Sequence, residues 1–469
     1  MEGNRKYIPI IMGLTLAFGV FVGSKLNFND STEKIFATNS KKDKLNRLID
    51  YIDYEYVDDV NTDSIVDVTV NGILENLDPH SVYIPVDEYE DNADDLRGNF
   101  VGIGVSFYVY NDTIAVIRAI EGGPAERAGI QGGDRILFAD GRKLFGETID
   151  RDSITKYLKG EINSKVKLKV FRPEEDELME VTVKRKRVPL VSVDASYPIT
   201  DDLGYIKVNR FSETTYAEFH QALENLRGQG MTKLILDLRN NPGGYVSTAQ
   251  QIADEFLEED KLVLITRNKN GEESRTYATD SGDFEEGRIY VLINENSAYY
   301  REYEDRYRNG ELRSADSIKV ADSLRFITPG GKVVYGGGGI IPDIFVPKDT
   351  SIENETLAYV TRSGFMSYFI FEHLEEDRSL YEAMTLEEFV RDFEASDELA
   401  DEFIAYSRFE DARIDISEYY QELKQALKAN IAQQLFDSNA YERILNQNDE
   451  MILKVMQLDS GQGASTADY

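Results

Sequence analysis

The chain has 469 residues, with 52 Lys and Arg against 86 Asp and Glu, so its formal net charge is −34. This balance argues against a protein that grips nucleic acid and against a polybasic membrane binder, because both need a basic face. Hydrophobic residues make up 41% of the chain, which is enough to form buried cores. At about 150 residues per domain, the length predicts roughly three domains.

The chain contains no cysteine, which excludes disulfides, thiol nucleophiles and zinc–cysteine sites. Its three histidines, His80, His220 and His373, are far apart in sequence, so a site built from several histidines is not expected. His80 follows a proline in a turn, where a structural hydrogen bond is the favoured role. We therefore predict no metal site and no cofactor.

Residues 1–25 have the composition of an export signal. A run of 18 uncharged residues, 7–24, would span about 27 Å as a helix, close to one hydrocarbon core. Arg5 and Lys6 precede this run, which favours a cytoplasmic N-terminus. A signal anchor and a cleaved signal peptide both fit, and a buried soluble helix is the third alternative. The first two place the chain at the periplasmic face of the cell envelope, either anchored in the membrane or secreted.

The residue composition and the spacing of apolar residues change twice over the next part of the chain. Residues 26–44 are polar and read as a linker, and residues 45–97 carry apolar positions at helical spacing, typical of a helical N-terminal cap. From 98 to 188 short β-rich runs follow, with one amphipathic helical stretch among them. We therefore predict a helical cap followed by a β domain.

Residues 189–350 alternate predicted strands and helices, which favours a mainly parallel sheet with βαβ units. Residues 351–458 read as helical and acidic. From 351 to the end there are 26 acids and 9 bases, half of the chain's net charge. A solvated helical surface is the ordinary interpretation, and an acidic docking surface is the alternative. Residues 459–469 read as a disordered tail.

Two glycine motifs could hold a carboxylate or an oxyanion. Gly102-Ile103-Gly104-Val105 can point successive backbone N–H groups at a peptide carboxylate. Gly243 and Gly244, in the motif LRNNPGG, follow a predicted strand and precede a helix. Their amides would then face the ligand-binding edge of a parallel sheet, suited to an oxyanion. Ser297 follows another strand and should lie at the same edge.

These motifs in this order resemble the carboxyl-terminal processing proteases, also called tail-specific proteases. GNFVGIGVSF and GPAERAGI resemble the family's PDZ domain, LILDLRNNPGG and VLINENSA resemble its core motifs, and ITPGGKVVYGGGGIIPDI resembles the segment that closes the core. The resemblance implies an exported endopeptidase with a serine nucleophile and a lysine general base. It also implies that the PDZ domain binds the substrate's C-terminus.

The sequence departs from the family at its nucleophile. Ser297 and Ala298 match the start of the motif S-A-S-A-S-E, but Tyr299 stands where the attacking serine belongs. No F-G-K-G motif follows, and Lys319, Lys332 and Lys348 lie outside the family's lysine context. A segment after Ala298 is therefore missing by comparison with the family, and Ser297 is only a weak catalytic candidate.

The predicted fold is an α+β multidomain protein with a helical N-terminal cap, a PDZ domain, a shortened βαβ-containing protease core and a helical C-terminal region. Three accounts of the departure stay open: a deleted or mis-assembled sequence, a natural pseudoprotease, and a site rebuilt around Ser297. The predicted partners are proteins or peptides with free apolar C-termini. The function is either that of an impaired exported serine protease or that of a PDZ-bearing envelope scaffold. The N-terminal helices could form the interface of a homodimer, as the resemblance alone implies.

Overall fold

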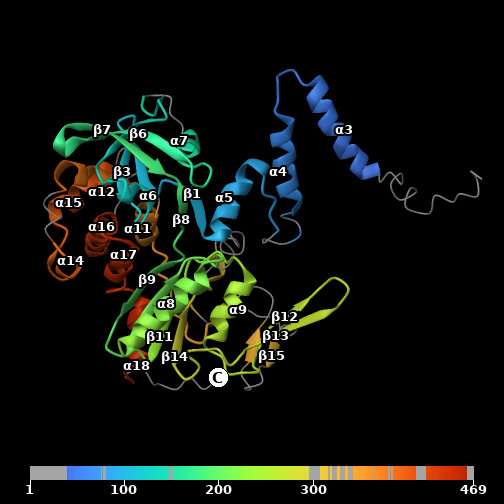
Figure 1. The fold of residues 1–469 in the computed structure, drawn as a ribbon. Coiled ribbons are helices and arrows are strands. Elements are labelled where there is room, and N and C mark those ends of the chain that lie inside the picture. Colours follow the sequence, from blue (N-terminus) through green and yellow to red (C-terminus); the bar gives the residue numbers. More distant parts are fainter. Residues whose placement is uncertain are drawn as a thin grey trace, which may run out of the picture. The chain divides into compact units, whose positions relative to one another are not determined.

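The computed structural model separates the chain into two compact units, Met1–Pro85 and Val86–Tyr469, and each is considered by itself (Figure 1). The residues that it describes are 40–74, 77, 81–146, 151–294, 307–314, 317–318, 325–327, 333–335, 342–362, 364–378, 381, 384–407 and 419–461. The predicted export signal, His80 and Ser297 lie outside these residues. Within the described part, no helix is long and apolar enough to cross a bilayer.

The described residues of the first unit form two helices, α3 (Ser40–Glu55) and α4 (Thr62–Leu74). The Thr62 hydroxyl donates to Asp53 Oδ1 at 3.2 Å and connects the two. The linker predicted over 26–44 is wrong for its last five residues, because α3 already begins at Ser40. Its first turn carries three lysines and an aspartate, so the apolar periodicity that marks the rest of the helix is absent there.

Residues 45–97, predicted as the cap, also contain the helix α5 (Val86–Arg97), which belongs to the second unit. Two of its aspartates bind different parts of that unit: Asp94 pairs with Lys159 at 3.2 Å and Asp95 pairs with Arg210 at 2.7 Å. The predicted cap is therefore divided between the two units. The spacing of apolar residues could not predict this division, because the contacts of α5 with the second unit described above are ion pairs.

The β-rich region forms a curved antiparallel sheet with the strand order β2-β3-β4-β6-β7, in which β5 also pairs with β4. Strands β1 and β8 form a separate pair beside it. The core of this region is apolar. Buried and exposed residues alternate along β6, because successive side chains of a strand point to opposite faces and one face packs against this core. Its elements are β1 (Asn99–Gly102), β2 (Val105–Tyr110), β3 (Thr113–Ala119), α6 (Pro124–Arg127), β4 (Arg135–Ala139), β5 (Arg142–Lys143), α7 (Arg151–Leu158), β6 (Lys165–Arg172), η2 (Pro173–Glu175), β7 (Glu177–Lys184) and β8 (Lys186–Pro189).

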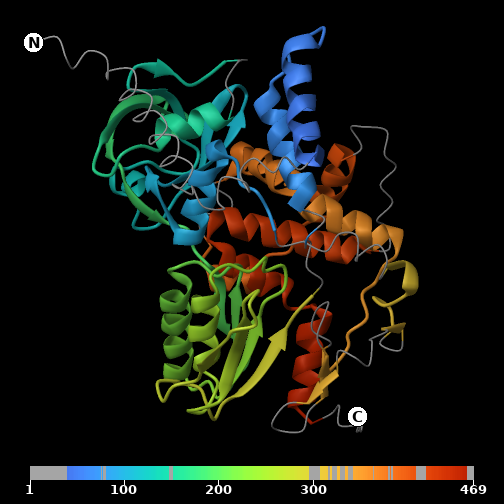
Figure 2. The same cartoon turned by 90° about the vertical axis from the view of Figure 1, so that its right-hand side faces the viewer.

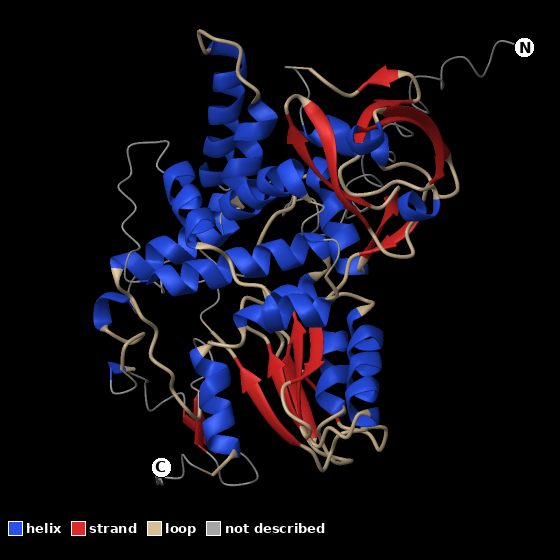
Figure 3. Ribbon diagram, turned by 90° about the vertical axis from the view of Figure 1, so that its left-hand side faces the viewer, coloured by secondary structure: helices blue, strands red, loops and turns tan. Residues whose placement is uncertain are grey.

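The next region is built on a second sheet of order β14-β11-β10-β9, separate from the first (Figure 3). Strand β11 runs parallel to β10 and to β14, as the βαβ pattern predicted, whereas β9 is antiparallel. Strand β12 (Leu262–Arg267) is not part of this sheet, because it pairs with β13 in a hairpin. The elements are β9 (Val193–Pro198), β10 (Leu203–Val208), α8 (Thr215–Gly228), β11 (Lys233–Asp237), α9 (Val246–Asp254), β12 (Leu262–Arg267), β13 (Glu273–Tyr277) and β14 (Arg288–Leu292).

Helices cover both faces of this sheet (Figure 2). Helices α8 and α9 pack on one face, and the C-terminal helix α18 packs Ile452 and Val455 on the other. Asp459, at the end of α18, pairs with Lys233 at 2.8 Å. The disordered tail predicted from 459 is therefore wrong at its first residue, since Asp459 completes a packed helix.

The acidic region is helical, as predicted, and most of it forms a core of its own. Helix α17 (Ser438–Leu445) packs Ala440 and Ile444 in this core and also bonds to the sheet: Asn439 Oδ1 accepts from the Ser196 amide at 3.0 Å, and Asn446, at the end of the helix, donates to the Tyr197 hydroxyl at 2.7 Å. A small hairpin, β15 (Arg325–Ile327) with β16 (Val333–Tyr335), precedes the region. The helices are α11 (Ile352–Arg362), α12 (Phe365–Asp377), α14 (Leu386–Asp392), α15 (Asp397–Ser407), α16 (Tyr420–Leu435), α17 (Ser438–Leu445) and α18 (Glu450–Asp459).

Candidate functional site

The loops after β11 and β14 meet at one edge of the second sheet, as the sequence predicted. The Asn240 amide donates to Asn294 Oδ1 at 2.9 Å, and Asn294 Nδ2 donates to Asn240 Oδ1 at 2.9 Å. Because β11 and β14 are parallel neighbours, their carboxyl ends place both loops at the edge where such sheets bind ligands. Ser297 follows Asn294 by three residues but lies outside the described residues.

The two glycines predicted as oxyanion donors differ. The Gly243 amide donates to Asn241 Oδ1 at 2.7 Å and is therefore engaged. Among the described residues, the Gly244 amide has no acceptor. Gly244 lies beside Phe211, which donates its amide to Gly243 O at 2.9 Å and accepts from the Tyr245 amide at 2.7 Å. Of the two glycines, Gly244 is therefore the one whose N–H group suits an oxyanion in the described structure.

Gly244 also has a structural role that predicts the result of a substitution. Its φ is +142°, and a Cβ atom there would lie 2.1 Å from the Phe211 carbonyl oxygen, which two backbone hydrogen bonds hold in place. We expect Gly244→Ala to destabilise the region by at least about 1–3 kcal/mol. Gly243→Ala should destabilise less, because its φ of +105° is unfavourable but no atom lies within 4 Å. Thermal unfolding of the two variants measures the difference, and equal effects would contradict the steric argument.

A buried ionic network lies directly beneath this edge. Asp237 is fully buried at the end of β11, where it receives Arg239 Nη2 at 2.6 Å and the Tyr205 hydroxyl at 2.7 Å. Arg239 Nη1 continues to Asp449 at 2.6 Å, at the start of α18. Burial by itself raises the pKa of Asp237, but the Arg239 guanidinium outweighs it and holds the pKa below its ordinary value. The network therefore keeps Asp237 ionised and ties the LRNNPGG loop to the C-terminal helix.

The lysines near this sheet are held in ion pairs. Lys207 of β10 contacts Glu442 Oε1 at 2.6 Å, and Lys348 contacts Glu355 Oε1 at 3.2 Å. A lysine that acts as a general base must lose its proton, whereas a carboxylate partner stabilises the charged form. Lys319 and Lys332 lie outside the described residues. Within the described part of the chain, neither Lys207 nor Lys348 is placed as a base.

The glycine loop of the first sheet has the arrangement that carboxylate binding needs. Ile103 and Gly104 lie between β1 and β2 and are buried, with Gly104 at a φ of +76°. Among the described residues, neither of their amides donates a hydrogen bond, while their carbonyls accept from Ala125 and Ile120. Strand β2, which follows Gly104, has β3 on one side and no described strand on the other. A peptide could add there as a strand, with its carboxylate at the loop.

The outer face of this sheet is covered by helix α12. Tyr108 and Tyr110 of β2 lie with their ring centroids 5.3 and 5.4 Å from that of Phe371. Arg135 pairs with Glu375, and both side chains are largely buried. This contact fixes the sheet face against the helical region, so the part of β2 left for a ligand is its edge.

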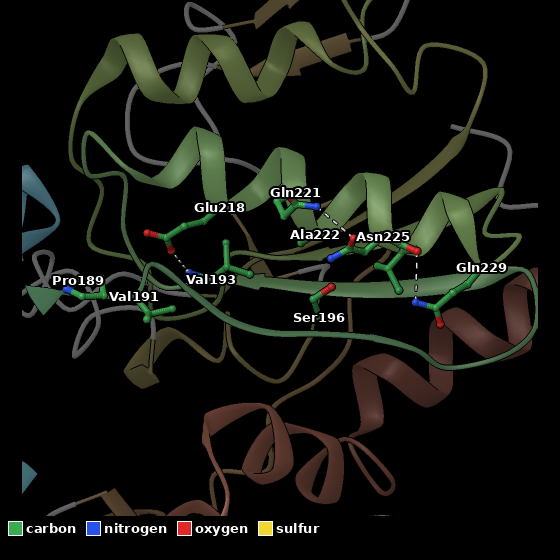
Figure 4. A pocket seen from close by; sticks show the side chains of 10 residues that line it. Pro189, Val191, Val193, Ser196, Glu218, Gln221, Ala222, Asn225 and Gln229 are labelled. Carbon is green, nitrogen blue, oxygen red and sulfur yellow. Dashed lines mark hydrogen bonds between the residues drawn. The ribbon is translucent and has the colours of Figure 1, made fainter. Parts of the chain in front are cut away.

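A separate pocket of about 470 Å³ lies between β9 and α8 (Figure 4). Val193, Ser196 and Asn225 are among its lining residues. Glu218 is its only charged residue, and its carboxylate already accepts the amides of Ser192 and Val193 at 2.7 and 3.1 Å. The pocket contains none of the residues predicted for binding or catalysis, and its carboxylate is engaged in holding the chain before β9.

Three family models match the chain in order: a PDZ domain over residues 101–184, peptidase family S41 over 202–299, and DUF8443, a family of unknown function, over 356–437. A probable CtpA-like serine protease of Staphylococcus aureus strain N315 is 27% identical, with 74% of each chain covered. A second, from Staphylococcus haemolyticus strain JCSC1435, is also 27% identical and covers 76% of this chain and 68% of its own. The chain is thus similar to the carboxyl-terminal processing proteases, with a PDZ region followed by a peptidase family S41 region.

Among solved structures, the photosystem II D1 C-terminal processing protease is similar to this chain. It is 25% identical, with a TM-score of 0.25, and covers 54% of this chain and 67% of its own. The PDZ domain of the carboxy-terminal protease from Vibrio cholerae, solved in complex with peptide, is 27% identical with a TM-score of 0.18. It covers 20% of this chain and 99% of its own. The PDZ and S41 assignments made from sequence motifs are confirmed by the two family models that match residues 101–184 and 202–299.

One cluster in the S41 core escaped the sequence analysis. His220, Glu255 and Asp283 come from three separate segments, and their ligand atoms all lie within 4.8 Å of one another. Sequence spacing gives no signal for it, since 35 and 28 positions separate the three residues. Only the packing of α9 and the following loop against α8 brings them together.

Proposed function

We propose that this chain binds the free C-termini of proteins through its PDZ domain and does not cleave them with a serine–lysine dyad. The observation that carries the proposal is the buried pair of unengaged amides at Ile103 and Gly104, next to the open edge of β2. Main-chain pairing with an edge strand supplies affinity in PDZ domains, and backbone amides capture the terminal carboxylate. Apolar residues beside the loop would receive the last side chain of the ligand.

The second half of the proposal concerns the reacting groups. The match to family S41 ends at Tyr299, the position where the sequence departs from the family's nucleophile motif. A serine two positions earlier on an extended chain would be displaced by about 6.6 Å. Displacement by much less disturbs alignment between a nucleophile and its oxyanion donors. The Gly244 amide would then remain as part of an oxyanion site that no nucleophile serves.

The binding half predicts a strong dependence on the terminal carboxylate. A fluorescent peptide with an apolar free C-terminus should bind the purified chain, and its C-terminally amidated form should bind roughly tenfold to a hundredfold more weakly. The reason is that amidation removes the charge from hydrogen bonds worth about 1.5–3 kcal/mol. Fluorescence anisotropy measures both affinities. Equal affinities would mean that Ile103 and Gly104 do not receive the carboxylate.

We also place the chain, as part of this proposal, at the periplasmic face of the cell envelope. The support is the basic residues and the 18-residue uncharged run near the N-terminus. Fractionation of cells that express the full chain tests the placement, with protease accessibility after permeabilisation as the readout. A homodimer through the N-terminal helices also belongs to the proposal, and sedimentation of the purified chain tests it.

A further inference from the structure

Three metal-ligating side chains converge on the helical face of the protease core. His220 lies in α8, Glu255 caps the end of α9, and Asp283 precedes β14. His220 Nε2 is 3.1 Å from Asp283 Oδ2 and 3.8 Å from Glu255 Oε1. Ligand atoms around a tetrahedral zinc ion, with bonds of about 2.0–2.2 Å, lie about 3.4 Å apart. The two separations from His220 Nε2 are thus already close to those that one ion requires, and all three ligand atoms lie within 4.8 Å of one another.

The charge of Glu255 also calls for a cation. Its side chain is only 1% exposed, and among the described residues no lysine or arginine pairs with it. The basic group within reach is His220, which is charged only when it is protonated. Buried carboxylates in proteins are generally paired with a cation or bound to a metal. A divalent ion between the three residues would supply the missing charge.

Neighbouring groups orient each of the three ligands. Glu255 accepts the Tyr216 hydroxyl at 2.8 Å on Oε1 and the Asp283 amide at 2.9 Å on Oε2. Arg227 holds Asp283 Oδ1 at 2.9 Å and leaves Oδ2 to face His220. Glu224 Oε2 lies 3.8 Å from His220 Nδ1, beyond hydrogen-bond distance, whereas His220 Nε2 lies 3.1 Å from Asp283 Oδ2, and this contact orients the imidazole. Such outer partners are typical of metal sites.

From this geometry we propose that His220, Glu255 and Asp283 bind a divalent transition metal ion, with zinc best suited to one imidazole and two carboxylates. The side chains of His220 and Asp283 are 30% and 40% exposed, so an ion can enter and water can occupy the fourth position. No metal site was predicted from the sequence, because that prediction depended only on the wide spacing of the three histidines. The ion would join α8, the end of α9 and the loop before β14.

Calorimetric titration of the chelator-treated full chain with zinc chloride tests the site. We expect one zinc per chain with saturable binding, and Co²⁺ should give the absorption bands of a tetrahedral site. His220→Ala should abolish both signals. Tyr216→Phe removes a hydrogen bond to Glu255 and keeps all three ligands, so it should weaken binding by about tenfold to a hundredfold.

His373→Ala is the matched control, because His373 bonds to the Tyr381 hydroxyl at 2.9 Å within the C-terminal helices and is not part of the cluster. It should bind zinc as the wild type does. Circular dichroism of each variant shows whether the fold is kept. The proposal is overturned if the wild type shows no saturable zinc binding, or if His220→Ala binds zinc as well as His373→Ala does.

Discussion

Neither the wild-type chain nor its Ser297→Ala variant should cleave an unstructured protein that ends in apolar residues. Removing the nucleophile from a serine protease lowers kcat by about 10⁶-fold, so cleavage should stay at the level of a blank. Tyr299 occupies the expected nucleophile position in the sequence, and a phenol is a weak nucleophile at neutral pH unless a positioned base removes its proton. Gel electrophoresis and mass spectrometry of the substrate over a day measure the result.

The comparison between the two proteins makes this experiment decisive. Both should still bind the labelled peptide, which shows that the PDZ domain is folded while cleavage is absent. Cleavage by the wild type that disappears in Ser297→Ala would contradict the proposal. It would mean that Ser297 has acquired a base and oxyanion donors in a rebuilt site.

Arg239→Met should destabilise the protease core by about 3–5 kcal/mol. The substitution keeps much of the side chain's volume but leaves Asp237 fully buried without its cation, and it removes the bond to Asp449 that holds α18. Hydrogen exchange of the amides in β10 and β11 measures the loss within the core itself. Replacing Asp237 with Asn in the same protein should recover part of the loss, because a neutral amide is cheaper to bury than a carboxylate.

The control is Arg267→Met in the hairpin of β12 and β13. Arg267 also pairs with an acid, Glu273, but its side chain is 67% exposed. Exposed ion pairs contribute about 0–1 kcal/mol, so this variant should match the wild type closely. Equal destabilisation by Arg239→Met and Arg267→Met would show that the network beneath the LRNNPGG loop does not stabilise the core.

The effect of Arg239→Met should also depend on pH. Asp237 has a lowered pKa in the folded wild type, so its stabilising contribution is present above the unfolded pKa of about 3.9 and is lost as pH falls through the lower folded pKa. Without Arg239, burial raises the pKa, and protonation relieves the variant at low pH. The stability difference should therefore begin to shrink above pH 4, where Asp237 of the variant takes up a proton, and shrink further as the pH falls through the lowered pKa of the wild type. A difference that grows there would contradict the assigned charge state.

Sequence patterns predicted local structure well where a residue's role depends on its neighbours in the chain. Strand alternation in 98–188 and the glycine motifs predicted the PDZ domain, and the βαβ pattern predicted that the loops at Asn240 and Asn294 meet. The strand at 262–267 has the same β-rich composition as its neighbours, so composition could not show that it forms a hairpin outside the sheet. Likewise, nothing local distinguishes α17 and α18 from the other acidic helices.

By itself, the sequence determined the resemblance to the processing proteases, the order of the PDZ and S41 regions and the departure at Tyr299, because these depend on residue identities at fixed spacing. Only the tertiary structure decided which of two adjacent glycine amides is free, since that depends on whether Asn241 turns back onto Gly243. It also decided that Asp449 completes the network of Asp237 and Arg239, and that His220 meets Glu255 and Asp283. These contacts join distant segments, and packing of the whole core selects them, whereas a motif records only what lies nearby along the chain.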